Sequence, residues 1–198
     1  MATDPDREAL LAELDATDFA LDAPLRHRAE AAFAVIDWSI DLAAAAATCA
    51  GRQALLRGAA HGFERHGPAV VAAIVRDQTG PVPCRGISEH ATVGDDVDAA
   101  RRFLVEQFGR VRGRPMEHMF AAVDDAVVSG RRLIVSERNF LDHELLEASH
   151  VAAGLSQREA HLKVHETIPP GANFSPHVLV ELHDHFGPEN FVYWGLTK

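Results

Sequence analysis

Histidine and glutamate side chains gather in the last third of this chain, where their spacing could support acid–base or metal chemistry. Seven of the 12 histidines in the 198 residues follow position 140. Imidazole beside a carboxylate suits a general base near neutral pH, and the same groups can hold a divalent metal that activates water. The residue types do not distinguish metal-free acid–base catalysis from metal-activated water. The cofactor therefore stays unspecified, and a divalent metal is the candidate. Six residues form the predicted catalytic set: His143, Glu144, Glu147, His150, His161 and His165.

Helical spacing predicts how this set is arranged. At 100° per residue, His143, Glu147 and His150 fall within about 60° of arc on one helix face. On the next helix, His161 and His165 lie opposite the charged residues and are expected to face inward. We predict that the side chains of the two helices form one shared site. The alternative is a solvated polar stripe on the first helix and hydrogen-bonded core histidines on the second.

Two known metal motifs match these residues in part. The segment His143-Glu-Leu-Leu-Glu147 resembles the zincin motif H-E-x-x-H, with glutamate in place of the second histidine. The segment Glu147-Ala-Ser-His150 has the E-x-x-H form of di-iron helical bundles, but it occurs once, whereas that chemistry needs it twice. A zinc-dependent hydrolase therefore remains an alternative, and a di-iron bundle is not expected.

The elements that must position these side chains are predicted to be helices. Asn139 is a suitable N-cap for a helix that Gly154 ends, and Ser156 with Glu159 forms a capping box that opens the next one. A third short helix is expected from Ser175-Pro176 to about residue 187. The predicted helices span about residues 5–16, 23–50, 95–110, 115–128, 140–153, 156–167 and 176–187, with two shorter helical stretches beside residues 66–68.

One segment, Arg131–Val135, has the composition of a strand, and a single strand cannot make a sheet. We therefore predict a mostly α fold, a compact multi-helix domain with at most one short strand or hairpin. A breaker-rich loop over residues 81–94 is expected to separate an N-terminal helical half, residues 1–80, from a C-terminal helical module, residues 95–198, that carries the His/Glu cluster. The two halves are expected to form one continuous domain.

Composition narrows the function classes. A net charge of −10 does not favour binding of duplex nucleic acid, which needs clustered Lys and Arg. Two cysteines, Cys49 and Cys84, make neither a disulfide framework nor a cysteine zinc site. The first residues lack the features of a signal peptide, and no segment has the length and apolar character of a membrane span.

Four short motifs between residues 139 and 195 deserve comparison with a known group. They are His143-Glu-Leu-Leu-Glu-Ala148, Gly154-Leu-Ser-x-x-x-Ala-His161, Ser175-Pro-x-Val-Leu179 and Tyr193-Trp-Gly195. Together they resemble the end of toxin domains found at the C-termini of bacterial polymorphic toxins, including RHS-repeat proteins. The resemblance implies functional roles for His143, Glu144, Glu147 and His161. It also implies a cognate immunity protein and action in a target-cell cytoplasm after export by a non-classical route. Where that group has a histidine before the proline, this chain has Ser175, with His177 two places later.

The leading hypothesis is a bacterial toxin or effector domain that acts as a hydrolase, directed at nucleic acid, a nucleotide or a peptide, through the His/Glu cluster. One alternative is a non-catalytic helical interaction or regulatory module that is cytoplasmic and whose histidines sense pH. The second alternative is a zinc-dependent hydrolase.

Overall fold

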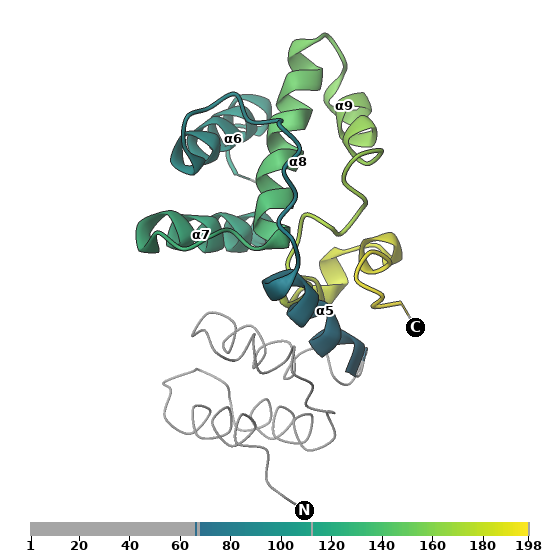
Figure 1. Ribbon diagram of the computed structural model, residues 1–198. Helices are drawn as coiled ribbons and strands as arrows, with labels where there is room; N and C mark the ends of the chain where they lie inside the picture. Colours follow the sequence, from purple (N-terminus) through teal and green to yellow (C-terminus); the bar gives the residue numbers. More distant parts are fainter. Residues whose placement is uncertain (1–65, 67, 112, 198) are drawn as a thin grey trace, which may run out of the picture.

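The computed structural model describes residues 66, 68–111 and 113–197 (Figure 1). The helices expected over residues 5–16 and 23–50, and the first of the two stretches beside residue 66, lie outside these residues. The described elements are α5 (Pro68–Thr79), α6 (Val93–Phe108), α7 (Gly113–Ser129), α8 (Val135–Ala152), α9 (Gln157–Val164), α10 (Pro176–Glu181) and the 3-10 turns η1 (His183–His185) and η2 (Pro188–Phe191). Within the described ranges there is no strand, which confirms the mostly α prediction. In the same ranges, no helix is both long enough and apolar enough to cross a membrane.

Helix α8 is the central element. It stands between α6 and α7 on one side and α9 on the other (Figure 1). Phe140 and Leu141 of α8 are fully buried, and the ring of Phe140 meets Phe120 of α7 edge-on, with 4.9 Å between centroids. Buried Phe103 and Leu104 of α6 complete this core. The packing fixes the face of α8 that carries His143.

The first residue of α8 differs from the predicted one, and local sequence signals did not indicate the difference. The helix begins at Val135, not at Phe140, so the predicted strand Arg131–Val135 is wrong: residues 131–134 are irregular, and Val135 is helical. The first turn is capped by one local and one tertiary contact. Glu137 accepts a hydrogen bond from the backbone N–H of Ile134 at 3.0 Å, and Asp77 of α5 accepts one from the N–H of Ser136 at 2.7 Å. These carboxylates satisfy amide donors that would otherwise lack partners.

Asn139, the predicted N-cap, lies inside α8. Its side chain is buried and donates a hydrogen bond to the carbonyl of Ala172 at 2.8 Å. It therefore ties α8 to the segment that leads into α10, instead of capping a helix end.

The connection between α8 and α9 follows the predicted signals. Gly154 has a φ of +99°, which a glycine adopts at low cost, and Ser156 forms the capping box with Glu159. Helix α9 ends at Val164, earlier than residue 167, and a turn follows in which the N–H of Ile168 donates to the carbonyl of Val164. Helix α10 likewise ends early, at Glu181, before η1. This short hairpin brings α9 back against α8.

The aromatic run near the C-terminus, residues 191–194, is partly buried. Phe191 and Trp194 are buried, whereas Val192 and Tyr193 are exposed. The indole N–H of Trp194 donates to the carbonyl of Gly171 at 3.0 Å. The end of the described chain is thereby held against the segment that follows α9.

Candidate metal centre

His143 lies on the buried side of α8, with 2% of its surface exposed. Its Nδ1 atom is 3.1 Å from Oε1 of Glu144. Its Nε2 atom is buried and has no hydrogen-bond partner among the described residues. A buried ring nitrogen without a partner is costly in a protein interior, which makes this atom a candidate ligand atom.

Helix α9 brings two further histidines to the same place. Nδ1 of His161 lies 2.9 Å from Oε2 of Glu147, and Nδ1 of His165 lies 3.3 Å from the carbonyl oxygen of Ile168. The Nε2 atoms of His161 and His165 are 3.1 Å apart. His165 is the C-cap of α9 and lies one turn after His161, so both side chains extend from the same side of the helix.

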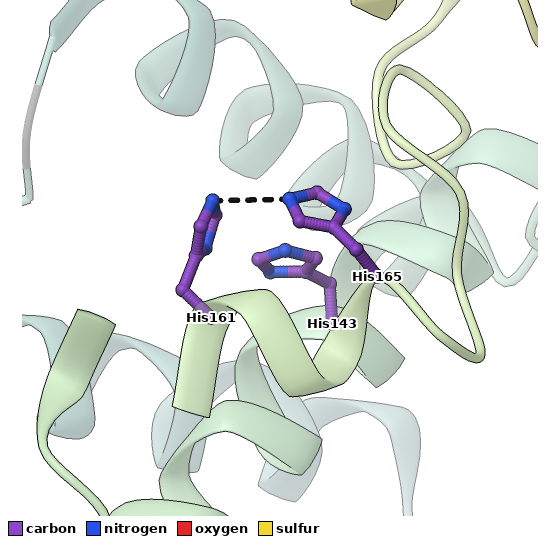
Figure 2. A group of neighbouring side chains, drawn as sticks. All are labelled: His143, His161 and His165. Atoms are coloured by element: carbon purple, nitrogen blue, oxygen red, sulfur yellow. Dashed lines mark hydrogen bonds between the residues drawn. The ribbon is translucent and has the colours of Figure 1, made fainter. Parts of the chain in front are cut away.

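The three imidazole rings converge on one point (Figure 2). The centroid of His143 is 5.1 Å from that of His161 and 5.6 Å from that of His165. One ring nitrogen of each histidine lies within 4.8 Å of the ring nitrogens of the other two. Two nitrogens bound to one tetrahedral zinc are roughly 3.3 Å apart, given Zn–N bonds of about 2.0–2.1 Å. The spacing therefore fits a single small metal ion.

The acceptors around the rings define which nitrogens face inward. Each Nδ1 atom faces an oxygen: Glu144 for His143, Glu147 for His161, and the Ile168 carbonyl for His165. If each Nδ1 carries the proton, each Nε2 presents a lone pair to the centre. Metal-binding histidines generally have this arrangement, in which the second nitrogen donates to a carboxylate or a backbone carbonyl.

Two groups of the cluster have shifted pKa values that follow from the same contacts. Burial acts to raise the pKa of Glu147, but hydrogen bonds from His161 and Gln157 and the charges of His143 and His161 outweigh it, so this pKa is lowered. The hydrogen bond to Glu147 raises the pKa of His161, against the effect of burial. Glu147 is therefore an anion that holds His161 by charge as well as by geometry.

His165 has the opposite shift. Burial, together with the charges of His161 and His143, lowers its pKa despite the hydrogen bond to Ile168. A neutral imidazole, the form that binds metal, is thereby favoured at this position.

A cavity of about 520 Å³ opens beside the three histidines. Glu144 and Glu147 contribute carboxylates to its wall, and both are almost fully buried. Its lining residues are Leu104, Phe108, Met116, His143, Glu144, Glu147, Gln157, His161, Leu162, His165, Pro170, Asn173, Phe174, Glu189 and Asn190. A small molecule could therefore reach the point on which the rings converge.

Of the six residues in the predicted set, the structure brings five together, namely His143, Glu144, Glu147, His161 and His165. His150 is the exception. It is half-buried near the end of α8, and it neither lines the cavity nor belongs to the group of three histidines. The helix arc placed it near Glu147, but the α8–α9 hairpin packs over the turn that carries His143 and Glu147.

Several residues at the site were not expected from the sequence. Gln157 donates a hydrogen bond to Oε1 of Glu147 at 2.9 Å, and Asn173 lies in the cavity wall. The carbonyl of Ile168 positions His165. No spacing rule identifies a backbone carbonyl or a loop amide as part of a site, because only the path of the chain decides what they face.

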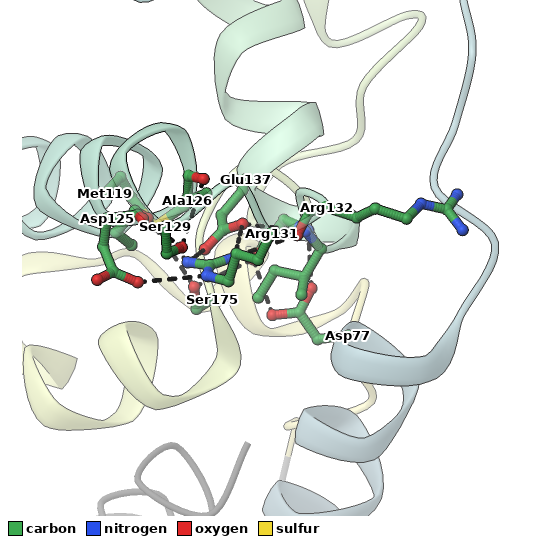
Figure 3. Close-up of polar contacts among 12 residues, drawn as sticks. Asp77, Met119, Asp125, Ala126, Ser129, Arg131, Arg132, Glu137 and Ser175 are labelled. Carbon is green, nitrogen blue, oxygen red and sulfur yellow. Dashed lines mark hydrogen bonds and ion pairs between the residues drawn. The ribbon is translucent and has the colours of Figure 1, made fainter. Parts of the chain in front are cut away.

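A second polar group lies at the other end of α8 (Figure 3). The hydroxyl of Ser136 donates to Asp77 at 2.7 Å and lies 3.0 Å from that of Ser175. Burial raises the pKa of Asp77 to about 7, against the hydrogen bonds from Ser136 and with the charge of Glu137 adding to the rise. Arg131 forms two hydrogen bonds with Glu137, at 2.7 and 2.8 Å. These contacts join α5, α8 and the start of α10.

Comparison of this chain with known proteins identified no relative, so the interpretation of the site depends on its own residues. No family model, no curated protein and no solved structure matches this chain.

Proposed function

We propose that this chain is a hydrolase whose catalytic centre is a divalent metal ion held by His143, His161 and His165. One observation carries the proposal: the three Nδ1 atoms face oxygen acceptors, and one ring nitrogen of each histidine lies within 4.8 Å of the ring nitrogens of the other two. Three protein ligands with an open fourth position are typical of catalytic zinc sites, whereas structural sites are closed by a fourth protein ligand. The cavity beside the rings supports an open position.

The remaining residues have roles that follow from their contacts. A zinc ion at this point would lower the pKa of a bound water to about 7. Glu144 lines the cavity and is the proposed general base for that water. Glu147 is a positioning residue, because it touches His161 and accepts from Gln157.

A metal-free mechanism is the second candidate, and the pKa shifts favour it. The pKa of His161 is raised and that of His165 is lowered, so the pair could act as acid and base. A proton shared between their Nε2 atoms would then take the place of the metal. This candidate predicts activity that chelators do not affect.

The biological role proposed for this hydrolase is that of a bacterial toxin or effector with a cognate immunity protein. The support is the resemblance of residues 139–195 to polymorphic toxin domains. Expression of the chain in a bacterial cytosol, beside a His143→Ala/Glu147→Ala double variant, tests this role. Growth arrest by the parent alone would support it, and equal growth with both soluble proteins would favour a non-catalytic helical module.

Metal binding is the direct test of the proposed centre. The purified protein is titrated with Co²⁺, which reports a tetrahedral site by visible absorption, and with Zn²⁺ by calorimetry. We expect one ion per chain, and a loss of affinity of at least about 100-fold on His143→Ala or His165→Ala. His150→Ala is the matched control on the same helix, and it should retain the ion. Equal affinity in all four proteins would contradict the proposed centre.

A further inference from the structure

The charge of the cavity wall restricts which substrates the proposed centre can accept. Among the described residues that line it, none is Arg or Lys, and three carboxylates are present, from Glu144, Glu147 and Glu189. Phosphoryl groups are bound in proteins by guanidinium, ammonium or backbone N–H groups, which balance their charge. A wall with three carboxylates and no Arg or Lys suits an uncharged substrate better than a phosphate ester, whose charge the proposed metal ion alone would have to balance.

Apolar side chains form much of the rest of the wall. Phe108, Met116 and Phe174, which also pack against the core, line the cavity together with Leu162 of α9. Leu162 is 59% exposed, so it belongs to the rim. An apolar or aromatic group of a substrate would gain free energy by covering these side chains.

Asn173 supplies an uncharged polar side chain to the cavity wall. The residue is only 5% exposed and lies in the cavity wall. An uncharged amide in the wall of a cavity can form hydrogen bonds with a ligand that enters it. The Nδ2 atom of an asparagine donates two hydrogen bonds and suits a carbonyl oxygen.

We propose, on the basis of the function proposed above, that the substrate is an uncharged carboxylic amide with an apolar side group, as in a peptide, and that Asn173 binds its carbonyl oxygen. Water adds to the carbonyl carbon and loses a proton to Glu144. The C–N bond then breaks, and the amine nitrogen takes that proton. The products are a carboxylic acid and an amine. Asn173 stabilises the oxygen on which negative charge develops.

A pair of ligands with the same ring tests the substrate class without requiring turnover. The zinc-loaded protein is titrated by calorimetry with N-acetylphenylalaninamide, which is uncharged, and with phenyl phosphate. The amide is expected to bind at least about tenfold more tightly, although phosphate has the stronger intrinsic attraction to zinc. Asn173→Ala is expected to weaken the amide about tenfold and to leave phenyl phosphate unchanged, since the lost group is one hydrogen-bond donor.

A charge added at the rim gives a second test that does not disturb the buried wall. Leu162→Lys should raise the affinity for phenyl phosphate, relative to that for the amide, about five- to tenfold, because it supplies the missing cation. Hydrolysis is followed in parallel with N-acetylphenylalanine 4-nitroanilide and bis(4-nitrophenyl) phosphate.

The outcomes separate this inference from the proposed function. A zinc-loaded protein that prefers phenyl phosphate, or that cleaves the phosphodiester and not the anilide, overturns the amide inference and leaves the metal centre intact. A protein that takes up no metal overturns the proposed centre, and the inference with it. Preference for the amide, weakened by Asn173→Ala, supports the inference even if the anilide is turned over slowly.

Discussion

The Nδ1 atom of His161 lies 2.9 Å from Oε2 of Glu147, 14 residues earlier in the chain and on the neighbouring helix. This contact joins the two helices of the α8–α9 hairpin at the point where the three histidine rings meet. Glu147 is almost fully buried, and its other oxygen accepts from Gln157. The carboxylate therefore fixes the orientation of His161 and links the local fold to the proposed centre.

Glu147→Gln tests whether this carboxylate tunes the metal. We expect zinc affinity to fall about 10- to 100-fold, because the partner of a metal-binding histidine sets both its orientation and its basicity. Competition with a chromophoric chelator measures the change. Glu166→Gln, at an exposed position that pairs with Lys163, is the control and should bind zinc like the parent. A matching loss in both variants would point to a general effect of charge.

Glu144→Gln separates the proposed base from the ligand set. The amide oxygen can still accept the hydrogen bond from His143, so at saturating zinc the variant should hold one ion, even if its affinity falls as in Glu147→Gln. Loss of the base should lower kcat by about 10²- to 10⁴-fold, with a smaller change in KM. Zinc analysis and steady-state rates on the same preparation check both expectations. Retained activity would mean that another group activates the water.

Asp77 should make stability depend on pH. The pKa of Asp77 is raised by burial from 3.8 to about 7 in the folded protein. Between pH 4 and 7 the folded state keeps a proton that the unfolded chain has released, so the free energy of unfolding should fall as the pH rises through this range. The midpoint of urea unfolding, measured at pH 5 and pH 7, gives the slope.

Asp77→Asn should flatten that slope. The amide keeps an acceptor for the N–H of Ser136 and a donor for its hydroxyl, but it has no proton to lose in this range. Asp98→Asn, on the exposed side of α6, should leave the slope as in the parent. An unchanged slope in the Asp77 variant would assign the pH dependence to other groups.

Two glycines with positive φ should respond differently to alanine. A Cβ at Gly171, where φ is +80°, would overlap the backbone carbonyl of Asn190, whereas one at Gly154, where φ is +99°, meets no atom within 4 Å. Gly154→Ala should cost about 1–2 kcal/mol of backbone strain. Gly171→Ala should cost more, because η2 must also move. Thermal unfolding of the two variants measures the difference, and equal losses would contradict the close approach.

The effect on the cavity should also differ. Glu189 and Asn190 of η2 line the cavity, so Gly171→Ala should weaken N-acetylphenylalaninamide. Gly154 is exposed at the hairpin turn, so its variant should bind the amide like the parent.

Local sequence signals were sufficient for the hairpin that carries the site. Gly154 and the Ser156–Glu159 capping box set the end of one helix and the start of the next. The one-turn spacing of His161 and His165 placed both on the same side of α9. These features depend on residues close together in the chain, and short-range rules of helix geometry govern them.

Long-range contacts decided the rest. The start of α8 at Val135 depends on Asp77, which is 59 residues before Ser136, and no local pattern could show that a carboxylate from α5 would cap this turn. His150 shares the predicted arc with His143 and Glu147, but only the packing of α9 determined which turn of α8 faces the cavity.

The sequence by itself determined that the protein is mostly helical and that imidazole and carboxylate groups gather on two adjacent helices. The tertiary structure decided which ring nitrogens face one another, because the oxygens of Glu144, Glu147 and Ile168 reach Nδ1 only after the chain has folded. It also brought Asn173 into the cavity wall, since the position of a loop amide follows from the path of the backbone and not from a periodic pattern.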